Sequence, residues 1–431
     1  MNLTILKKKN FILLMQSKFV SQLGSVLQTF ALSLYVLNTY DSATLFASVL
    51  MIGMIPRILL GPIAGVFVDW FDRKKIIILL DVANGAIVAL VAILYFTTGT
   101  LPLWAIYSLV LGLSLINLMF APAISTVIPT IMSDEELFDA NTIDQFIMTI
   151  ANILAPIIAG IFMGLTGIGI ILAFNSLSFF ISAVTESFIK IPKLNLQHEK
   201  LSYQVFKEDF MDGLRFFLNI KVLLKLMIMS LVLNFALSPI YSVAVPYILK
   251  KVYFVTDIHF GMFESIVVGA SIIAMLVAGW ASKHYTIEKI IRIDIGLQPI
   301  LVGFIALIST TWFINMFTGY AIPFASMILI TCIIIIIITI GNIAIHTMFQ
   351  KIVPKEKLGR IGTVVGTISA GAMPLGQGLM GLAIDAMPVW IAIGISVFIM
   401  ALASIYTVIY FKDGLFDDLS NKAKLTPVKN F

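Results

Sequence analysis

The sequence has one cysteine, Cys332, in 431 residues, and only 12% of its residues are charged. A single cysteine excludes a disulfide within the chain and any metal site built from several cysteines. Soluble globular proteins carry about 25% charged residues. A chain with about half that share and a mean hydropathy of +1.04 is therefore expected to be an integral membrane protein.

The sequence patterns of common catalytic sites are also absent. The chain contains no His-Glu-x-x-His, no Gly-x-Ser-x-Gly and no cluster of paired carboxylates, which argues against a membrane-embedded enzyme. It lacks Gly-x-x-x-x-Gly-Lys-[Ser/Thr], so direct use of ATP is not expected. We expect no metal, no cofactor and no enzymatic activity.

Hydrophobic segments fill most of the chain, and about 20 apolar residues cross a bilayer as a helix. We predict twelve spans, at about 11–38, 43–69, 76–98, 102–131, 140–164, 168–190, 221–249, 258–282, 287–311, 317–349, 358–384 and 388–411. The net charge of +5 does not indicate nucleic-acid binding, because the lysines and arginines gather in loops between spans.

The distribution of these cations predicts the orientation in the membrane. Of 28 lysines and arginines, Lys250 and Lys251 fall in loops assigned outside, while Lys18 and Arg57 lie within spans. The remaining 24 lie at or near one side, which is cytoplasmic by the positive-inside rule. We therefore predict a multi-pass protein of the cell membrane with both termini in the cytoplasm.

The longest break between spans divides the chain into two halves. The second part of this break, 203–218, has apolar residues on one helical face and charges on the other, which predicts an amphipathic helix on the membrane surface. The predicted fold is all-α, with two pseudo-symmetric six-helix bundles. They occupy residues 1–190 and 221–412, with a cytoplasmic linker at 191–220 and a cytoplasmic tail at 413–431.

The loop between the second and third predicted spans has a distinctive pattern. It reads Gly65-x-x-x-Asp69, followed by Asp72-Arg73-Lys74-Lys75. This resembles the signature loop of the major facilitator superfamily, Gly-x-x-x-Asp followed by Gly-Arg-Lys, except that Asp72 replaces the glycine. The flanking Gly-Pro-x-Ala-Gly and the later Asp81 resemble the bacterial macrolide and multidrug efflux branch.

The resemblance implies a role for this loop. In that superfamily the carboxylate and cations form a cytoplasmic charge latch that is made and broken as the carrier alternates. Carried over, the latch comprises Gly65, Asp69, Arg73 and Lys74, and Asp81 lies near enough in sequence to join it. The alternative is a positively charged anchor with no part in gating.

A proline followed four residues later by glycine occurs in the fifth and the eleventh predicted spans. The pairs are Pro156 with Gly160, and Pro374 with Gly378. The first resembles the Gly-Pro-x-x-Gly-Gly motif of the antiporters, although an ordinary helix kink is an equal alternative. The arginine that antiporters often carry in the fourth span is absent from 101–131.

Ionisable groups within spans are costly and are therefore functional candidates. Glu264 and Asp144 are the leading candidates for carrying protons. Arg57, near the middle of the second span, either lines a central cleft, snorkels to the interface, or pairs with an acid such as Asp144 or Glu264. Glu186, at the end of the sixth span, is expected to be solvated at the interface.

Small polar and aromatic groups on several spans are candidates for lining a substrate cavity. They are Gln28, Tyr35, Asn234, Tyr241 and Gln377, although each also fits a role as filler between helices. A largely apolar pocket with a few amides and rings suits bulky amphipathic molecules better than sugars.

The resemblance implies a bacterial secondary transporter that exports hydrophobic or amphipathic compounds by alternating access, as an antiporter coupled to protons. Such drug or macrolide efflux confers antibiotic resistance. We expect a monomer that binds a small molecule, protons and the lipid bilayer but no nucleic acid. Uptake of a metabolite by a carrier of the same fold is the alternative.

Overall fold

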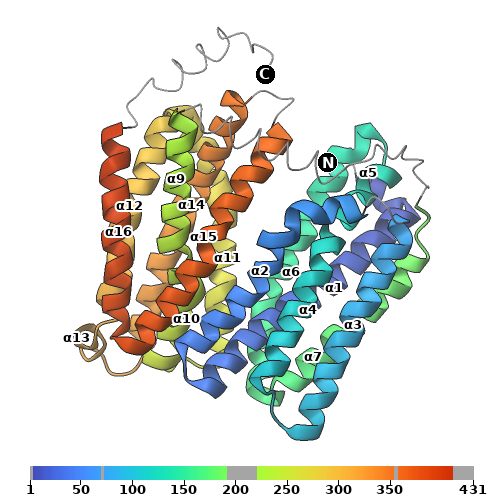
Figure 1. Ribbon diagram of the computed structural model, residues 1–431, viewed down its shortest axis with the longest axis horizontal. Helices are drawn as coiled ribbons and strands as arrows, with labels where there is room; N and C mark the ends of the chain where they lie inside the picture. Colours follow the sequence, from blue (N-terminus) through green and yellow to red (C-terminus); the bar gives the residue numbers. More distant parts are fainter. Residues whose placement is uncertain (1–2, 69–71, 192–220, 354–357, 411–431) are drawn as a thin grey trace. The chain divides into compact units, whose positions relative to one another are not determined.

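The structure is a computed structural model that describes residues 3–68, 72–191, 221–353 and 358–410 (Figure 1). These residues form helices and contain no strand. The helices are α1 (Lys9–Tyr40), α2 (Ala43–Val68), α3 (Arg73–Thr98), α4 (Leu103–Ser125), α5 (Val127–Ile131), α6 (Leu137–Thr166), α7 (Ile168–Ser187), α9 (Lys221–Ala236), α10 (Val245–Tyr247), α11 (Asp257–His284), α12 (Ile287–Ile308), α13 (Thr311–Ile314), α14 (Ala321–Ile352), α15 (Leu358–Ala386) and α16 (Val389–Tyr410). The predicted linker helix at 203–218 and the tail at 413–431 lie outside the described residues.

Eleven segments of the described chain are long and apolar enough to cross a membrane. They correspond to eleven of the twelve predicted spans. The exception is the eleventh predicted span, which forms the 29-residue helix α15. Several glycines, together with Gln377 and Asp385, lower the hydropathy of α15. The all-α fold is confirmed, because all twelve predicted spans are helical, although the fourth is divided into α4 and α5 and the seventh is interrupted.

The first compact unit contains the described helices up to α7 together with Thr256–Ser265 of α11. In it α7 packs along α3 and α1, α2 packs along α4, and α1 also packs against α6. The sequence did not predict that the start of α11 would belong with the first half of the chain. The rest of α11 belongs to the second unit.

Local capping explains where several helices of the first unit begin. Asp72, which replaces the signature glycine, precedes α3, and its Oδ1 accepts a hydrogen bond from the Lys75 backbone N–H at 3.2 Å. Such a cap satisfies a donor that the first helical turn leaves unpaired. The aspartate therefore gives α3 a defined start at the charged loop.

A second polar contact anchors the N-terminal end of α1 to the loop before α6. Lys8 Nζ donates to Glu136 Oε2 at 2.5 Å, and the Ser133 hydroxyl donates to the same oxygen at 2.7 Å. These hydrogen bonds, with Lys8 the stronger cause, lower the pKa of Glu136 from its usual value to about 2. The loop before α6 is thus fixed to the N-terminal end of α1.

The second compact unit contains α9, α10, the remainder of α11, and α12 to α16. Here α12 packs against α16 and α14, and α9 packs against α15. The seventh predicted span is interrupted. Helix α9 ends at Ala236, and after Pro239 the chain continues through two π-helical turns, Ile240–Ala244 and Ile248–Val252.

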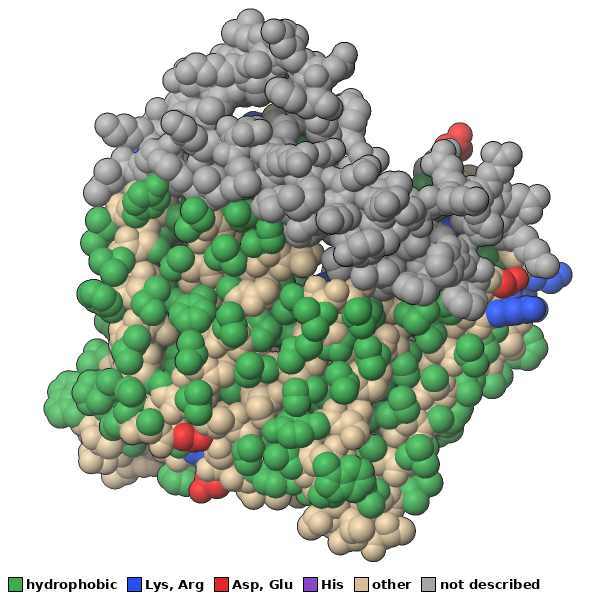
Figure 2. Space-filling model, viewed as in Figure 1, with side chains coloured by type: hydrophobic (Ala, Val, Ile, Leu, Met, Phe, Trp, Pro, Cys, Tyr) green, Lys and Arg blue, Asp and Glu red, His purple; other side chains and the backbone are tan. Residues whose placement is uncertain are grey.

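The outward flanks of the described helices are hydrophobic. Large exposed side chains include Leu79, Leu90 and Ile93 of α3 and Leu402 and Ile405 of α16. Figure 2 shows that hydrophobic side chains dominate the face in view, while the few charged groups lie near helix ends. Apolar flanks of this kind are suited to lipid rather than water.

Candidate functional site

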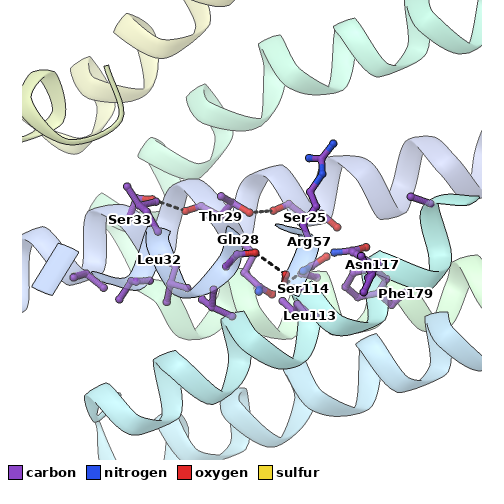
Figure 3. Close-up of a pocket in the computed structure, with 18 of the residues that line it drawn as sticks. Ser25, Gln28, Thr29, Leu32, Ser33, Arg57, Leu113, Ser114, Asn117 and Phe179 are labelled. Carbon is purple, nitrogen blue, oxygen red and sulfur yellow. Dashed lines mark hydrogen bonds between the residues drawn. The ribbon is translucent and has the colours of Figure 1, made fainter. Parts of the chain in front are cut away.

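A cavity of about 700 Å³ lies within the first unit, between α1, α2 and α4 with two side chains of α7 (Figure 3). Its polar lining residues are Ser25, Gln28, Thr29, Ser33, Arg57, Ser114, Asn117 and Asn175. Apolar side chains form the rest of the wall, among them Leu32, Val36, Phe46, Val49, Leu113 and Phe179. This combination of apolar walls and few polar groups is typical of small-molecule sites.

Helix α1 supplies one continuous polar face of the cavity. Ser25, Thr29 and Ser33 recur every four residues and therefore point to the same side of the helix. Each hydroxyl donates to the carbonyl oxygen four residues earlier, at 2.7, 2.8 and 2.9 Å respectively, and Figure 3 shows the two later bonds as dashed lines. Because their protons are engaged, these hydroxyls offer mainly acceptor oxygens to the cavity.

Two contacts hold the cavity wall in shape. The Ser114 hydroxyl donates to the Gly53 carbonyl at 2.6 Å, which ties α4 to α2. A Cβ on Gly53 would lie 3.0 Å from Val110, so glycine permits this close approach. Deeper in, Asn175 Nδ2 of α7 donates to Gln28 Oε1 at 2.7 Å, and both side chains are buried.

Arg57 supplies the only charge among the residues that line this cavity. Its side chain is exposed, and no carboxylate of the described residues pairs with it. The predicted pairing with Asp144 or Glu264 is not found. A cation in a mostly apolar cavity is therefore available to a ligand.

The other predicted cavity residues lie elsewhere. The Tyr35 hydroxyl accepts from the Leu101 backbone N–H at 2.8 Å and does not line the cavity. Asn234, Tyr241 and Gln377 belong to the second unit, where Gln377 Nε2 donates to the Ser242 hydroxyl at 3.1 Å.

The predicted latch is described only in part. Gly65 lies in α2, while Asp69 lies outside the described residues. Arg73 is the first residue of α3, and Lys74 Nζ donates to the Ser187 carbonyl at the end of α7, at 2.6 Å. Asp81 is completely buried.

Asp144, a predicted proton carrier, forms an ion pair with Lys18 that joins α6 to α1. The two side chains are only 22% and 12% exposed. Because the Asp144 carboxylate neutralises the Lys18 ammonium, the structure favours a structural role for Asp144 over proton transfer. Glu264 of α11 is partly buried, and the structure gives it no ion pair within the described chain.

The Lys18 and Asp144 pair leads to a stability prediction. Asp144→Asn leaves a largely buried ammonium without its counter-charge, so we expect a loss of about 1–3 kcal/mol and a lower melting temperature in detergent. The double replacement Lys18→Met with Asp144→Leu is expected to recover most of that loss, because no unpaired charge remains. A double variant less stable than Asp144→Asn would contradict a structural role for the pair.

Helices α6 and α11 cross closely within the first unit, at the predicted proline and glycine motif. A Cβ on Gly160 would lie 2.5 Å from the Asp257 carbonyl oxygen, and one on Gly261 would overlap the Pro156 carbonyl oxygen. The Ser265 hydroxyl donates to the Ile153 carbonyl at 2.6 Å. Small residues thus allow backbone-to-backbone packing here.

In α15 the corresponding close approach involves a different glycine. Pro374 and Gly378 both lie in α15, and between them a Cβ on Gly376 would overlap the Phe235 carbonyl oxygen of α9. Close packing of α15 on α9 therefore depends on Gly376, which lies between the two residues of the repeated motif.

Sequence reasoning missed three buried polar residues. Asp294 of α12 accepts from Gln298 Nε2 at 2.7 Å and lies against Gly341, where any Cβ would collide with its carboxylate. Glu186 was expected to be solvated, but it is 4% exposed. Because acids inside spans are costly, their presence there could have identified Asp294 and Glu186 as functional candidates. The third residue is the buried Asn175, which nothing in the sequence distinguishes.

Helical bundles with lipid-compatible flanks define a multi-pass membrane protein, and solved structures show the same fold. A variant of the nucleoside transporter NupG superposes with a TM-score of 0.72 at 15% identity, covering 93% of this chain and 100% of that one. A bacterial homologue of the iron transporter ferroportin, in its inward-facing state, gives 0.68 at 14% identity, covering 95% and 98%.

The family model of the transmembrane secretion effectors, a group of the major facilitator superfamily, matches residues 2–425, and the chain belongs to that family. The chain is also 24% identical over 384 residues to macrolide efflux protein A of Streptococcus pyogenes, covering 88% of this chain and 90% of that protein. Its family and its structural neighbours are transporters.

Proposed function

We propose that this carrier exports hydrophobic or amphipathic small molecules by alternating access and that protons drive the export. The observation that carries the proposal is the 700 Å³ cavity of the first unit, whose walls are mostly apolar. Bulky amphipathic molecules gain most of their binding energy from apolar burial, whereas sugars require many hydrogen bonds. The similarity to macrolide efflux protein A supports the direction of transport.

The cavity also favours one kind of polar group on the substrate. Arg57 is cationic, and none of the described residues that line the cavity is a carboxylate that could receive an amine. An acidic or oxygen-rich group can accept charge-assisted hydrogen bonds from the guanidinium. The acceptor oxygens of the α1 hydroxyls suit a substrate that also carries a hydroxyl or amide donor.

Transport into everted membrane vesicles tests the function and its direction. Energised vesicles that contain the carrier are expected to accumulate a fluorescent acidic amphiphile, and collapsing the proton gradient is expected to release it. Vesicles without the carrier are the control. Accumulation in right-side-out vesicles instead would show uptake and would overturn the proposal.

We propose that Gly65, Asp69, Arg73 and Lys74 form the cytoplasmic latch that the resemblance implies, with both termini in the cytoplasm and the carrier acting as a monomer. The Lys74 contact with Ser187 supports a part for this loop in fixing α3 to α7. Asp69→Asn is expected to slow the conformational exchange and to reduce export. Unchanged export by this variant would remove Asp69 from the latch.

A further inference from the structure

Two acids that have no role in the cavity lie together between α3 and α7. Asp81 is 0% and Glu186 is 4% exposed, and the electrostatic interaction between them places the carboxyls near one another. The Ser182 side chain, one turn before Glu186, lies beside both carboxyl groups and is also 0% exposed. Packing of α3 along α7 encloses all three groups.

The polar atoms of this cluster lack completed hydrogen bonds. Both Asp81 carboxyl oxygens, Glu186 Oε2 and the Ser182 hydroxyl are buried without a partner among the described residues. Buried polar groups are rarely left in this state. Neighbouring acceptor oxygens without donors indicate that a proton is shared between them.

Among the described residues, no cation forms an ion pair with either acid. Lys74 of α3 lines the same narrow space as Glu186, but its ammonium donates to the Ser187 carbonyl and makes no ion pair with either carboxyl, and Lys75 is exposed. Helix α4, which packs on α3, has no charged residue.

The charged groups of α1 and α6, which pack on α7, are also accounted for. Lys18 and Asp144 pair with each other, Asp139 has a partner of its own, and Lys9 is exposed. Arg73, at the start of α3, likewise has an interaction of its own. The two carboxyls therefore face each other without a counter-ion in the described chain.

Two neighbouring carboxylates in a site that excludes water cannot both remain ionised, because desolvation and mutual repulsion each disfavour the second charge. When one carboxyl keeps its proton, its O–H donates to the other carboxylate, and the Ser182 hydroxyl donates to a remaining oxygen. We propose that Asp81, Glu186 and Ser182 form a proton-binding site, the acid pair site, which binds and releases one proton.

The location of the acid pair site indicates what a proton would change. Lys74 and Glu186 line the same narrow space, and Lys74 is fixed to the end of α7 beside Glu186. Loss of the proton puts a second negative charge between α3 and α7, which draws the Lys74 ammonium away from the Ser187 carbonyl. The use of this site in coupling rests on the proposed function, whereas proton binding itself does not.

Infrared spectroscopy of the full-length carrier in nanodiscs tests proton binding directly. At neutral pH the wild type is expected to show the carbonyl stretch of a protonated carboxylic acid. The double variant Asp81→Asn with Glu186→Gln removes both carboxyls that hold the shared proton, so it is expected to lose the share of that band that comes from the site. Each single variant leaves one buried carboxyl, which desolvation keeps protonated. Asp144→Asn, which removes an acid paired with Lys18, is the matched control and is expected to keep the band.

The outcomes separate this proposal from the proposed function. If the double variant keeps the full wild-type band, both acids are ionised in the wild type and the acid pair site is refuted, whether or not the carrier exports. Coupling is tested by adding substrate to the wild type. If the variant loses the band as expected, but substrate does not change the size of the wild-type band, the proton site stands and its coupling to export fails. Amide replacements keep the shape of each side chain, and a melting curve for each variant verifies folding.

Discussion

Gly160→Leu is expected to abolish most export. Its Cβ would lie 2.5 Å from the Asp257 carbonyl oxygen, where another backbone rather than a movable side chain occupies the space. Overpacking of this kind costs about 1–3 kcal/mol, and here it forces α6 and α11 apart. Because this crossing joins the start of α11 to the rest of the first unit, we expect its disruption to disturb that unit and to reduce export. Export of a fluorescent amphiphile by everted vesicles measures the effect.

Helix α6 offers a matched control four residues further on. A Cβ on Gly164 would meet nothing within 4 Å, so Gly164→Leu is expected to retain export and the melting temperature of the wild type. Gly261→Leu, on the opposite side of the crossing, is expected to reproduce the loss seen at Gly160. Equal activity of the Gly160 and Gly164 variants would contradict a role for the close crossing.

Arg57→Gln is expected to change which substrates are exported. Among the described residues that line the cavity, only Arg57 is charged, and a charge-assisted hydrogen bond contributes about 1.5–3 kcal/mol. Its loss corresponds to roughly 10- to 100-fold weaker binding of an acidic amphiphile, whereas a neutral analogue of the same shape loses little. Competition between the two analogues during export measures this change in selectivity.

Arg57→Lys provides the control, because it keeps the charge but loses the planar guanidinium. We expect it to retain most of the preference for acidic substrates when the substrate is recognised by charge. If Arg57→Gln and the wild type show the same preference, Arg57 does not contact the substrate.

The helices were predictable because hydrocarbon requires each span to satisfy its own backbone hydrogen bonds. Long apolar runs and the asymmetry of lysines therefore determine the spans with little help from tertiary contacts. Asp72 was identified as a departure from the signature, but its role as the cap of α3 appears only from backbone geometry.

The site was less predictable, because it depends on which helix faces meet. Gln28 and Arg57 were identified from their types, and both line the cavity. Asn175, by contrast, matters only because α7 packs on α1 and places it beside Gln28. Glu186 was placed at the interface because it is near a span end, yet packing of α3 on α7 buries it.

Exchange of substrate for protons in proteoliposomes tests the central claim most directly. With the purified carrier and an imposed proton gradient, we expect an acidic amphiphile to move against its own concentration gradient, and we expect the amphiphile to drive proton movement in the opposite direction when no gradient is imposed. Arg57→Gln is expected to weaken both. Movement of the amphiphile only down its own gradient, with no accompanying proton flux, would contradict the account.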